Sequence, residues 1–371
     1  MVFLCGWYPS RVLPNNGDFI QRHAEAVGIV NNVSVIHIIS DPLTKKEIEI
    51  SKSTTKNIVT YIAYIKVVNS SIKKGILFTK AFKILLEKIG HFDIIHLNKL
   101  YPFGIFALYL KWFYKKPFLI SEHWTGYQSL LVNNISKLEL FFSKIIAKKA
   151  NFICPVSDNL KEAMITKGLM GNYQKVPNVV DCDLFNPSNS KQETFTIIHA
   201  SNMNDSHKNI SGLLNIIREF SLKVSNFEFL LIGENSTKYE KKVMALGIQK
   251  NVKFIDHISH AKIAKELKRA HAFVLFSNYE NLPCVILESF SCGIPVISTN
   301  VGGIAEYFPK DFGFLVESGN EKEFVEALLK LFYSYTPNPN TMHTYVKELF
   351  SKISIAKKFQ SLYNKIVNER S

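Results

Sequence analysis

Two glutamates frame the segment of this chain whose residue types are best suited to chemistry, ENLPCVILESFSCGIPVIST (280–299). Glu280 follows an apolar run that predicts a β-strand, and Pro283 stands where a helix carrying Glu288 would begin. Free N–H groups at a helix start suit a phosphate, and a carboxylate accepts hydrogen bonds from paired hydroxyls. We therefore predict that Glu280 contacts a sugar and that Glu288 reaches a ribose; the alternative is two ordinary carboxylates beside a turn. The predicted binding turn between them consists of Asn281, Leu282 and Pro283.

A second group of polar residues follows another predicted strand, in HASNMNDSHKNISGLL (199–214). Lys208 and its neighbour His207 supply positive charge of the kind that stabilises a departing diphosphate, and Asn202 adds a neutral hydrogen-bond donor. We assign these three residues to the same binding site and give Lys208 a catalytic role. The alternative is that Lys208 is a solvated loop residue.

Two loops in the N-terminal half also follow predicted strands. In WYPSRVLPNNGDFIQRH, Gly17 opens a helix, so its backbone can approach a phosphate or sugar closely, and we assign it to donor binding, with a role in the turn alone as the alternative. Arg22 and His23, one turn later, are predicted contacts for a second substrate, with ordinary surface residues as the alternative. In SEHWTGY, His123 directly follows a buried strand and is a candidate catalytic residue.

The elements that must position these loops alternate along the chain. Short apolar, β-branched runs are separated by longer amphipathic ones, which indicates parallel sheets covered on both faces. The alternation breaks at VPNVVDCDLFNPSNSKQET (176–194) and then restarts. The predicted strands are Val2–Gly6, Val33–Ile39, Ile58–Tyr64, Asp93–Leu97, Phe118–Ser121 and Phe152–Val156 before the break, and Thr196–Ala200, Phe227–Ile232, Val252–Ile255, Ala272–Phe276, Pro295–Ser298 and Gly313–Val316 after it.

This pattern predicts an α/β protein with two Rossmann-like, doubly wound domains that face each other across a cleft. Open parallel sheets bind ligands beyond the carboxyl ends of their strands, so such a cleft suits a reaction between two substrates. We expect an acceptor-side domain at 1–188 and a nucleotide-binding domain at 189–344, followed by a helical pattern over Tyr345–Val367.

The segment 280–299 resembles the E-x-x-P…E-(small)-x-x-x-G-x-P-V signature of the retaining glycosyltransferases of family 4, also called group 1, which have the GT-B fold. NVGGIAEYF, GFLV, CGWYPSRVLPNNGDFIQRHAEAV, ISEHWTGY, PVSDNLKEAM and VPNVVDCDLFNP extend the resemblance over nearly the whole chain. It implies that Glu280 contacts the transferred sugar, that Glu288 holds the nucleotide ribose and that His123 is functional. It also implies that the C-terminal segment 345–371 packs back on the first domain.

The resemblance further implies an activity. A UDP- or GDP-sugar would donate a sugar to a hydroxyl of a glycan or lipid-linked acceptor with retention of configuration, as in the synthesis of cell-surface polysaccharides. Asp181-Cys182-Asp183 spells the DxD of metal-dependent glycosyltransferases, but it falls in a loop that does not bind metal in this family. We expect no essential metal and no cofactor, with Lys208 and the helix N-terminus supplying positive charge.

One position departs from the family pattern. The family places Gly-Arg and then Lys on the donor diphosphate, whereas this chain has Ser201-Asn202 and Lys208, one residue further apart. Asn cannot replace the bidentate fork of Arg, so either His207 or Arg22 compensates or activity falls. The departure motivates an alternative function, an inactive nucleotide-sugar-binding or scaffolding subunit of a membrane glycan-assembly complex. A GT-B epimerase acting on a UDP-sugar is a third interpretation.

The charge of the chain, +14, is unevenly distributed. Residues 1–190 carry 23 Lys and Arg against 13 Asp and Glu, and the remainder carries 22 against 18. Basic helical patterns at 73–88 and 137–149 suit an anionic membrane surface, and core-facing helices with solvated lysines are the alternative. No motif indicates nucleic-acid binding.

The compartment is predicted from three absences in the sequence. The N-terminus lacks a signal-peptide pattern, no apolar run is long enough to cross a bilayer, and the five cysteines have no metal-binding spacing. We therefore expect a cytoplasmic protein, with attachment to the inner face of the cell membrane left open.

Overall fold

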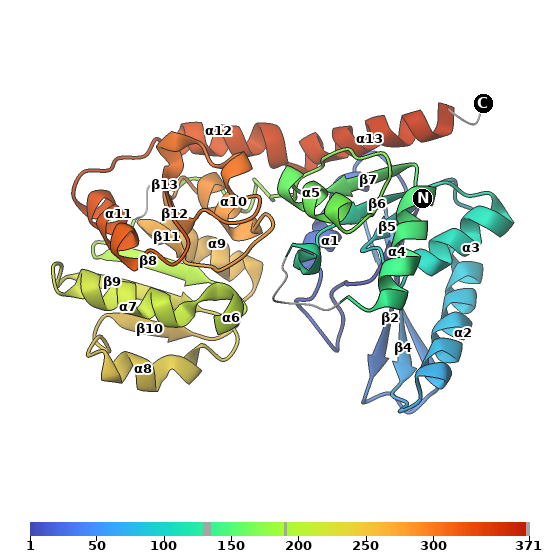
Figure 1. The fold of residues 1–371 in the computed structure, drawn as a ribbon, viewed down its shortest axis with the longest axis horizontal. Helices are drawn as coiled ribbons and strands as arrows, with labels where there is room; N and C mark the ends of the chain where they lie inside the picture. The colour runs from blue at the N-terminus through green and yellow to red at the C-terminus, as the bar shows by residue number, and fades with distance from the viewer. Residues whose placement is uncertain (129–134, 189–190, 369–371) are drawn as a thin grey trace. The chain divides into compact units, whose positions relative to one another are not determined.

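A computed structural model describes residues 1–128, 135–188 and 191–368, and the chain divides into two compact units (Figure 1). The first unit comprises Met1–Val179 and Lys352–Ser371, and the second comprises Val180–Ser351. The chain therefore passes from one unit to the other after Val179 and again after Ser351, where the sequence placed the divisions after 188 and after 344.

The first unit is built on a seven-stranded sheet of order β3-β4-β2-β1-β5-β6-β7. All neighbours pair in parallel except β3, which runs antiparallel to β4 at the edge. The chain builds outward from β1 to one side and then returns to add β5, β6 and β7 on the other, so the switch point lies between β1 and β5. The strands are β1 Val2–Cys5, β2 Val33–Asp41, β3 Ile48–Thr55, β4 Ile58–Lys66, β5 Ile95–Asn98, β6 Phe118–Glu122 and β7 Phe152–Pro155.

Helices cover this first sheet, and one of them comes from the far end of the chain. The helix α13 packs against α1, because its apolar stripe, which includes Phe359 and Tyr363, joins the core formed by Phe3, Ile20 and other residues. The predicted return of the C-terminal segment to the first domain is confirmed from Lys352 on, whereas residues 345–351 belong to the second unit. The helices of this unit are α1 Asp18–Val27, α2 Ser71–Ile89, α3 Gly104–Tyr114, α4 Lys137–Lys149, α5 Asp158–Thr166 and α13 Lys352–Asn368, with a 3-10 turn η1 at Thr125–Tyr127.

The second unit repeats the plan with a six-stranded parallel sheet of order β10-β9-β8-β11-β12-β13. Its switch point lies between β8 and β11. The strands are β8 Phe195–Ala200, β9 Phe227–Ile232, β10 Val252–Ile255, β11 Ala272–Leu275, β12 Val296–Thr299 and β13 Gly313–Val316. The helices are α6 Asp205–Lys208, α7 Ile210–Ser221, α8 Glu240–Ala245, α9 His260–Arg269, α10 Cys284–Ser291, α11 Glu321–Tyr333 and α12 Pro339–Phe350, with 3-10 turns η2 Ser236–Tyr239, η3 Ala305–Tyr307 and η4 Lys310–Phe312.

The two doubly wound sheets confirm the predicted fold class, and every predicted strand is present with small shifts at its ends. The strand β3 was not predicted, because IEISKSTT is polar and lies at an exposed edge without an apolar run. The single helix predicted over Tyr345–Val367 is wrong. The extended backbone of Ser351 (φ −61°, ψ 157°) separates α12, which packs on α10, from α13. The sequence could not show this break because the apolar periodicity continues on both sides of it.

Candidate active site

The predicted donor-binding residues of the second unit lie at the switch point of its sheet. The segment between β8 and α7 carries Asn202, His207 and Lys208, and the loop after β11 carries Glu280. The two strands are neighbours and run in parallel, so their following loops meet at one edge. This placement agrees with the position at which open α/β sheets bind ligands.

Glu280 is the centre of this group. Its side chain is buried, with the whole residue 4% exposed, and it forms an ion pair with the Nζ of Lys208. The Nε2 of His207 lies 3.5 Å from the second carboxylate oxygen, and the hydroxyl of Ser277 donates to the first at 2.8 Å. The structure therefore brings together two of the three predicted catalytic residues, and Ser277 is a partner that the sequence did not single out.

The electrostatics of the group keep Glu280 ionised. Burial by itself raises the pKa of a carboxyl, but the positive charge of Lys208 and the hydrogen bond from His207 outweigh it and lower the pKa of Glu280 to about 2. The side chain is therefore an anion at neutral pH, and it can only accept hydrogen bonds.

The backbone around Glu280 is fixed by the turn that follows β12. Gly302 has φ +60°, and a Cβ atom there would lie 1.7 Å from the carbonyl oxygen of Glu280. The N–H of Gly303 donates to the carbonyl of Asn281 at 2.9 Å, and the hydroxyl of Thr299 donates to the carbonyl of Ser277 at 2.7 Å. The first glycine of the Gly-Gly pair in NVGGIAEYF, Gly302, is thus required by a close backbone contact with the glutamate turn.

A short helix presents His207 and Lys208. The helix α6 begins at Asp205, where the side chain of Asn204 accepts a hydrogen bond from the N–H of His207. The His207 ring stacks on Tyr279 with centroids 4.2 Å apart and planes 1° apart, and the N–H of Asn278 donates to the carbonyl of His207 at 2.9 Å. Four helical residues are too few to leave a periodic signal, so α6 was not predicted.

The other residues predicted for the donor site lie in the same two segments of the chain as Glu280 and Lys208. Asn281 and Leu282 are buried, Pro283 is the N-cap of α10, and Glu288 lies on that helix with only 3% of its surface exposed. Asn202 is exposed, and its side-chain oxygen accepts the N–H of Asn204 at 3.2 Å. The predicted helix start is therefore present beside Glu280.

Lys238 is a cation that the sequence reasoning missed. It lies in η2, after β9, and its Nζ donates to the carbonyl of Met203 at 2.6 Å. Met203 belongs to the same loop as Asn202 and has φ +56°. The signal that could have found Lys238 is the strand order, because β9 is the other neighbour of β8 and its loop opens on the same edge.

The predicted residues of the first unit gather around α1. Gly17 caps the helix with φ +79°, and a Cβ atom there would lie 2.6 Å from the carbonyl carbon of Trp7, so the turn itself requires glycine. The approach of the Gly17 backbone to a donor phosphate or sugar stays a prediction. Arg22 and His23 are buried rather than on the surface, which corrects the alternative given for them. Arg22 pairs with Asp18 at 3.5 Å, and both His23 nitrogens lie within reach of carbonyl oxygens, of Phe19 at 2.8 Å and of Pro177 at 3.3 Å.

His123 packs beside these residues. Its ring lies 4.7 Å from that of Phe19 and 5.1 Å from that of His23, and its Nδ1 is 3.2 Å from Oδ1 of Asn178. Burial is the main cause that lowers the pKa of His123 well below its ordinary range, and burial also lowers the pKa of His23 to about 4. Both rings are therefore neutral at pH 7.

The DxD sequence serves as a turn in this structure. The Oδ1 of Asp181 accepts the N–H of Leu184 at 3.3 Å, and its carbonyl accepts the N–H of Phe185 at 2.8 Å. Within residues 1–128, 135–188 and 191–368, no three His, Cys, Asp or Glu side chains gather in a way that could hold a metal ion.

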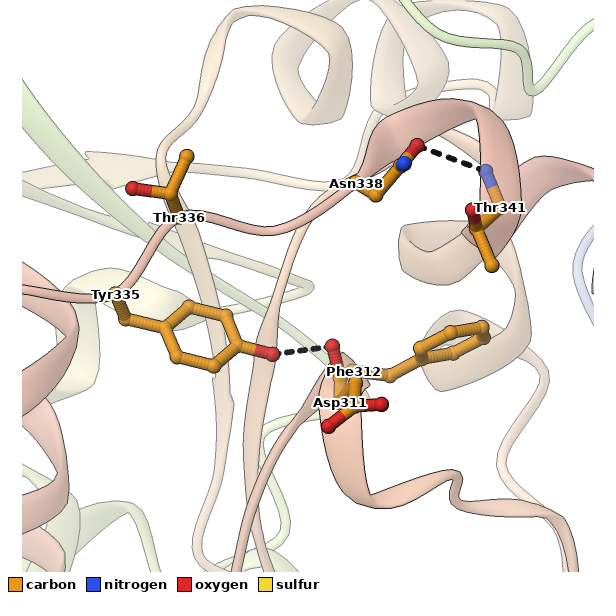
Figure 2. A pocket seen from close by; sticks show the side chains of 6 residues that line it. All are labelled: Asp311, Phe312, Tyr335, Thr336, Asn338 and Thr341. Atoms are coloured by element: carbon orange, nitrogen blue, oxygen red, sulfur yellow. Dashed lines mark hydrogen bonds between the residues drawn. The ribbon is translucent and has the colours of Figure 1, made fainter.

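A pocket of about 340 Å³ lies in another part of the second unit (Figure 2). Asp311 and Phe312 line it from just before β13, and Tyr335, whose hydroxyl donates to the Asp311 carbonyl, lines it from the segment before α12. Residues that precede a parallel strand lie at the opposite edge of the sheet from those that follow one. The pocket is therefore separate from the Glu280 turn, and it contains no predicted site residue. The other lining residues are Thr336, Asn338 and Thr341.

Comparison with known families agrees with this architecture. The model of the group 1 glycosyl transferases matches residues 183–348, and that of glycosyltransferase family 4 matches residues 32–184. Together the matches cover most of both units. The chain belongs to the group 1 glycosyltransferases with the GT-B fold.

Individual relatives are more distant. The chain is 27% identical to a phosphatidylinositol N-acetylglucosaminyltransferase subunit from Arabidopsis thaliana over 219 residues, which are 57% of this chain and 48% of that protein. The corresponding human protein is 27% identical over 58% of this chain and 46% of its own length. The match thus spans about half the length of these curated relatives.

Solved structures resemble the fold over almost its whole length. A sucrose-phosphate synthase from Thermosynechococcus elongatus superposes with a TM-score of 0.81 at 18% identity, covering 99% of both chains. Anabaena HepE in complex with UDP and glucose has a TM-score of 0.76 at 15% identity, covering 98% of this chain and 99% of its own. At such identities the likeness shows the fold alone.

Proposed function

We propose that the protein transfers a sugar from a UDP- or GDP-sugar to a hydroxyl of a glycan or lipid-linked acceptor with retention of configuration. The observation that carries the proposal is the buried, ionised Glu280 held by Lys208 and His207 at the switch point of the second sheet. Burying a charged group costs desolvation free energy, and such groups are found most often at functional sites. Cell-surface polysaccharide synthesis is the process we expect it to serve.

The proposed step follows from the charges. The bond between the anomeric carbon and the diphosphate oxygen breaks, and the departing nucleoside diphosphate takes the electron pair. Lys208 and the N–H groups at the start of α10 stabilise that negative charge, while Glu280 accepts hydrogen bonds from the sugar hydroxyls. The acceptor oxygen bonds to the anomeric carbon on the same face, and its proton passes to the departing diphosphate oxygen. Because lysine charge and a helix N-terminus suffice for the leaving group, we expect no metal requirement.

Lys238 is the residue that we propose as a replacement for the family's arginine. Its ammonium is anchored to the carbonyl of Met203, in the loop where the arginine is missing. A lysine supplies a point charge but no bidentate fork, so the replacement keeps electrostatic stabilisation and loses directional contacts. We expect Lys238→Met to weaken UDP binding about tenfold and Lys242→Met, on the nearby α8, to leave it unchanged.

The UDP-sugar donor has support from other proteins. HepE has been crystallised with UDP and with UDP-glucose, and the plant and human relatives are N-acetylglucosaminyltransferase subunits.

A membrane-associated acceptor has support from α3. This helix ends in three consecutive exposed aromatic residues, Trp112, Phe113 and Tyr114, at 51%, 73% and 51% exposure, and Lys115 follows them on the surface. Aromatic rings beside lysines are typical of surfaces that lie on anionic bilayers. In the part of the chain that the structure describes, no helix is both long and apolar enough to span a bilayer. We expect sedimentation with phosphatidylglycerol vesicles, and Phe113→Ser to reduce it severalfold.

The deciding experiment is a screen of UDP- and GDP-sugars for protection against thermal unfolding and for hydrolysis. We expect one nucleotide-sugar to raise the melting temperature, and UDP or GDP to be released slowly without an acceptor. Nucleotide binding without any turnover would favour the scaffolding role, and isomerisation of the donor without acceptor would favour an epimerase. No binding of any nucleoside diphosphate would refute the donor site.

A further inference from the structure

A lysine of the first unit is enclosed by two tryptophans. The Nζ of Lys99 lies 4.3 Å from the centroid of the Trp7 ring and 4.9 Å from that of Trp124. All three residues are half-buried. Each of these contacts is a cation–π interaction, which orients the ammonium without giving it an acceptor for its N–H groups.

The three residues come from neighbouring strands of one sheet. Trp7 follows β1, Lys99 follows β5 and Trp124 follows β6, and these strands are adjacent and parallel. Lys99 therefore lies at the switch point of the first sheet, which is the ligand-binding position of open α/β folds. Its backbone has φ +71°, an uncommon conformation for a non-glycine residue and one that recurs at binding sites.

A buried carboxylate holds this arrangement in place. The side chain of Glu122 accepts N–H groups of Leu100 at 2.9 Å, His123 at 2.9 Å and Trp124 at 3.0 Å. It thereby ties the loop that carries Lys99 to the loop that carries Trp124. Glycine makes room for the indole, because a Cβ atom on Gly126 would lie 2.4 Å from the Trp124 ring.

No described residue accepts a hydrogen bond from the ammonium of Lys99. Over residues 1–128, 135–188 and 191–368, the structure gives the Lys99 side chain no hydrogen bond and no ion pair within 4.0 Å; its described side-chain contacts are the two rings, and carboxylate charge reaches it from Glu122 and Glu139. The oxygens of Glu122 are already engaged by the three N–H groups. A lysine that is half-buried, fixed on two sides and without an acceptor leaves its remaining N–H groups available to an anion.

We propose that Lys99 binds an anionic group, a phosphate or a carboxylate, on the acceptor substrate. This inference rests on the proposed function, because it assigns the second substrate to the first unit, and it adds that this substrate is charged. Trp7 and Trp124 hold the ammonium in position, and Glu122 is a positioning residue that fixes both loops.

The chain offers a direct spectroscopic test, because it contains three tryptophans and two of them contact Lys99. The third, Trp112, is exposed on α3, so a Trp112→Phe protein reports on this site by its intrinsic fluorescence. We would titrate that protein with glucose 6-phosphate, glucuronate and glucose, each with saturating UDP present.

We expect a saturable fluorescence change with at least one of the two anionic sugars and none with glucose. A response to glucose 6-phosphate alone identifies a phosphate, and a response to glucuronate alone identifies a carboxylate. Lys99→Met should weaken the responding sugar at least about tenfold, and Lys99→Arg should retain part of the affinity. The matched control is Lys116→Met, since Lys116 also lies over an aromatic ring, that of Phe92 at 5.3 Å.

No saturable change with either anion, an equal response to glucose, or unchanged affinity in Lys99→Met would overturn the inference. The UDP-induced shift in melting temperature, measured on the same variants, separates this outcome from failure of the proposed function. A folded Lys99→Met protein should keep the full UDP shift. If neither the parent protein nor any variant responds to a nucleotide, the proposed donor site is refuted. The titration with anionic sugars still tests the anion site in that case.

Discussion

The two sheets have the same strand order around their switch points, yet the residues at their carboxyl edges differ in kind. In the second unit the edge carries a charged group, with Glu280 paired to Lys208. In the first unit the edge carries neutral, buried histidines and an aromatic enclosure around Lys99. One backbone plan thus supports two environments, because the loops rather than the strands carry the chemistry.

This difference suggests a division of labour. An ionised carboxylate beside a lysine suits polar hydroxyls and a leaving group that gains charge, whereas neutral rings suit an acceptor whose hydroxyl must stay reactive. Substitutions that impair the function of one edge and leave the other unaffected would support this division. Substitutions that affect both edges equally would contradict it.

The largest effect should follow loss of Glu280. We expect Glu280→Ala to abolish turnover and Glu280→Gln to reduce it about 10³-fold, because the neutral amide cannot replace the ionised acceptor. Donor turnover is the measurement, and Glu326→Gln, on the exposed face of α11, is the control. Near-normal activity of either variant would count against the site.

Acid should weaken the first unit before the second. His23 and His37 have their pKa lowered to about 4 by burial, so the unfolded chain binds protons that the folded chain excludes. Stability is therefore lost as pH falls from about 6.5 towards 4, by about 3 kcal/mol for each such histidine. The histidines with lowered pKa are His23, His37, His96 and His123 in the first unit, and His199 and His271 in the second.

The check is hydrogen exchange of peptides from each unit at pH 7 and pH 5. We expect protection to fall more in the first unit. Glu280 adds a loss in the second unit only below about pH 4.5, since its pKa of about 2 means that its stabilising charge is lost as pH falls towards that value. Equal loss of protection in both units at pH 5 would contradict the comparison.

Removal of Lys208 should have a somewhat smaller effect than removal of Glu280. We expect Lys208→Met to lower turnover about 10²-fold, because the leaving group loses one fixed positive charge while the helix N-terminus remains. Lys322→Met, an exposed lysine on α11, serves as the control for net charge. If Lys208→Met changed only the affinity for the acceptor and left donor turnover intact, our assignment of Lys208 to the donor would be wrong.

The smallest effects should come from two glycines, one beside the carboxyl edge of each sheet. Gly17→Ala and Gly302→Ala should each cost about 2 kcal/mol or more of stability, because a Cβ atom would overlap backbone atoms. Gly319 has the same φ, +79°, as Gly17 but nothing within 4 Å, so Gly319→Ala should cost only about 1 kcal/mol. Denaturant unfolding measures all three, and equal losses would show that backbone conformation alone, rather than close contact, sets the requirement.

Much of this site could be predicted because its residues sit in strongly patterned sequence. Glu280 and Glu288 are flanked by Pro and Gly signals that place a strand, a turn and a helix, and each of these elements is present. Lys238 and Lys99 could not be singled out in the same way. Each is one lysine among many, and only the neighbouring strands bring Lys238 to Met203 and Lys99 to its two tryptophans.

The sequence by itself determined the two sheets, the order of their strands in the chain and the glutamate turn, because apolar periodicity and Pro and Gly positions act over short distances along the chain. Only the tertiary structure decided which side chains are partners. The pairing of Glu280 with Lys208, the burial of His23 and the break at Ser351 all depend on contacts between residues far apart in the sequence. Such contacts leave no local pattern, since any residue of suitable charge or size at the same strand edge could make them.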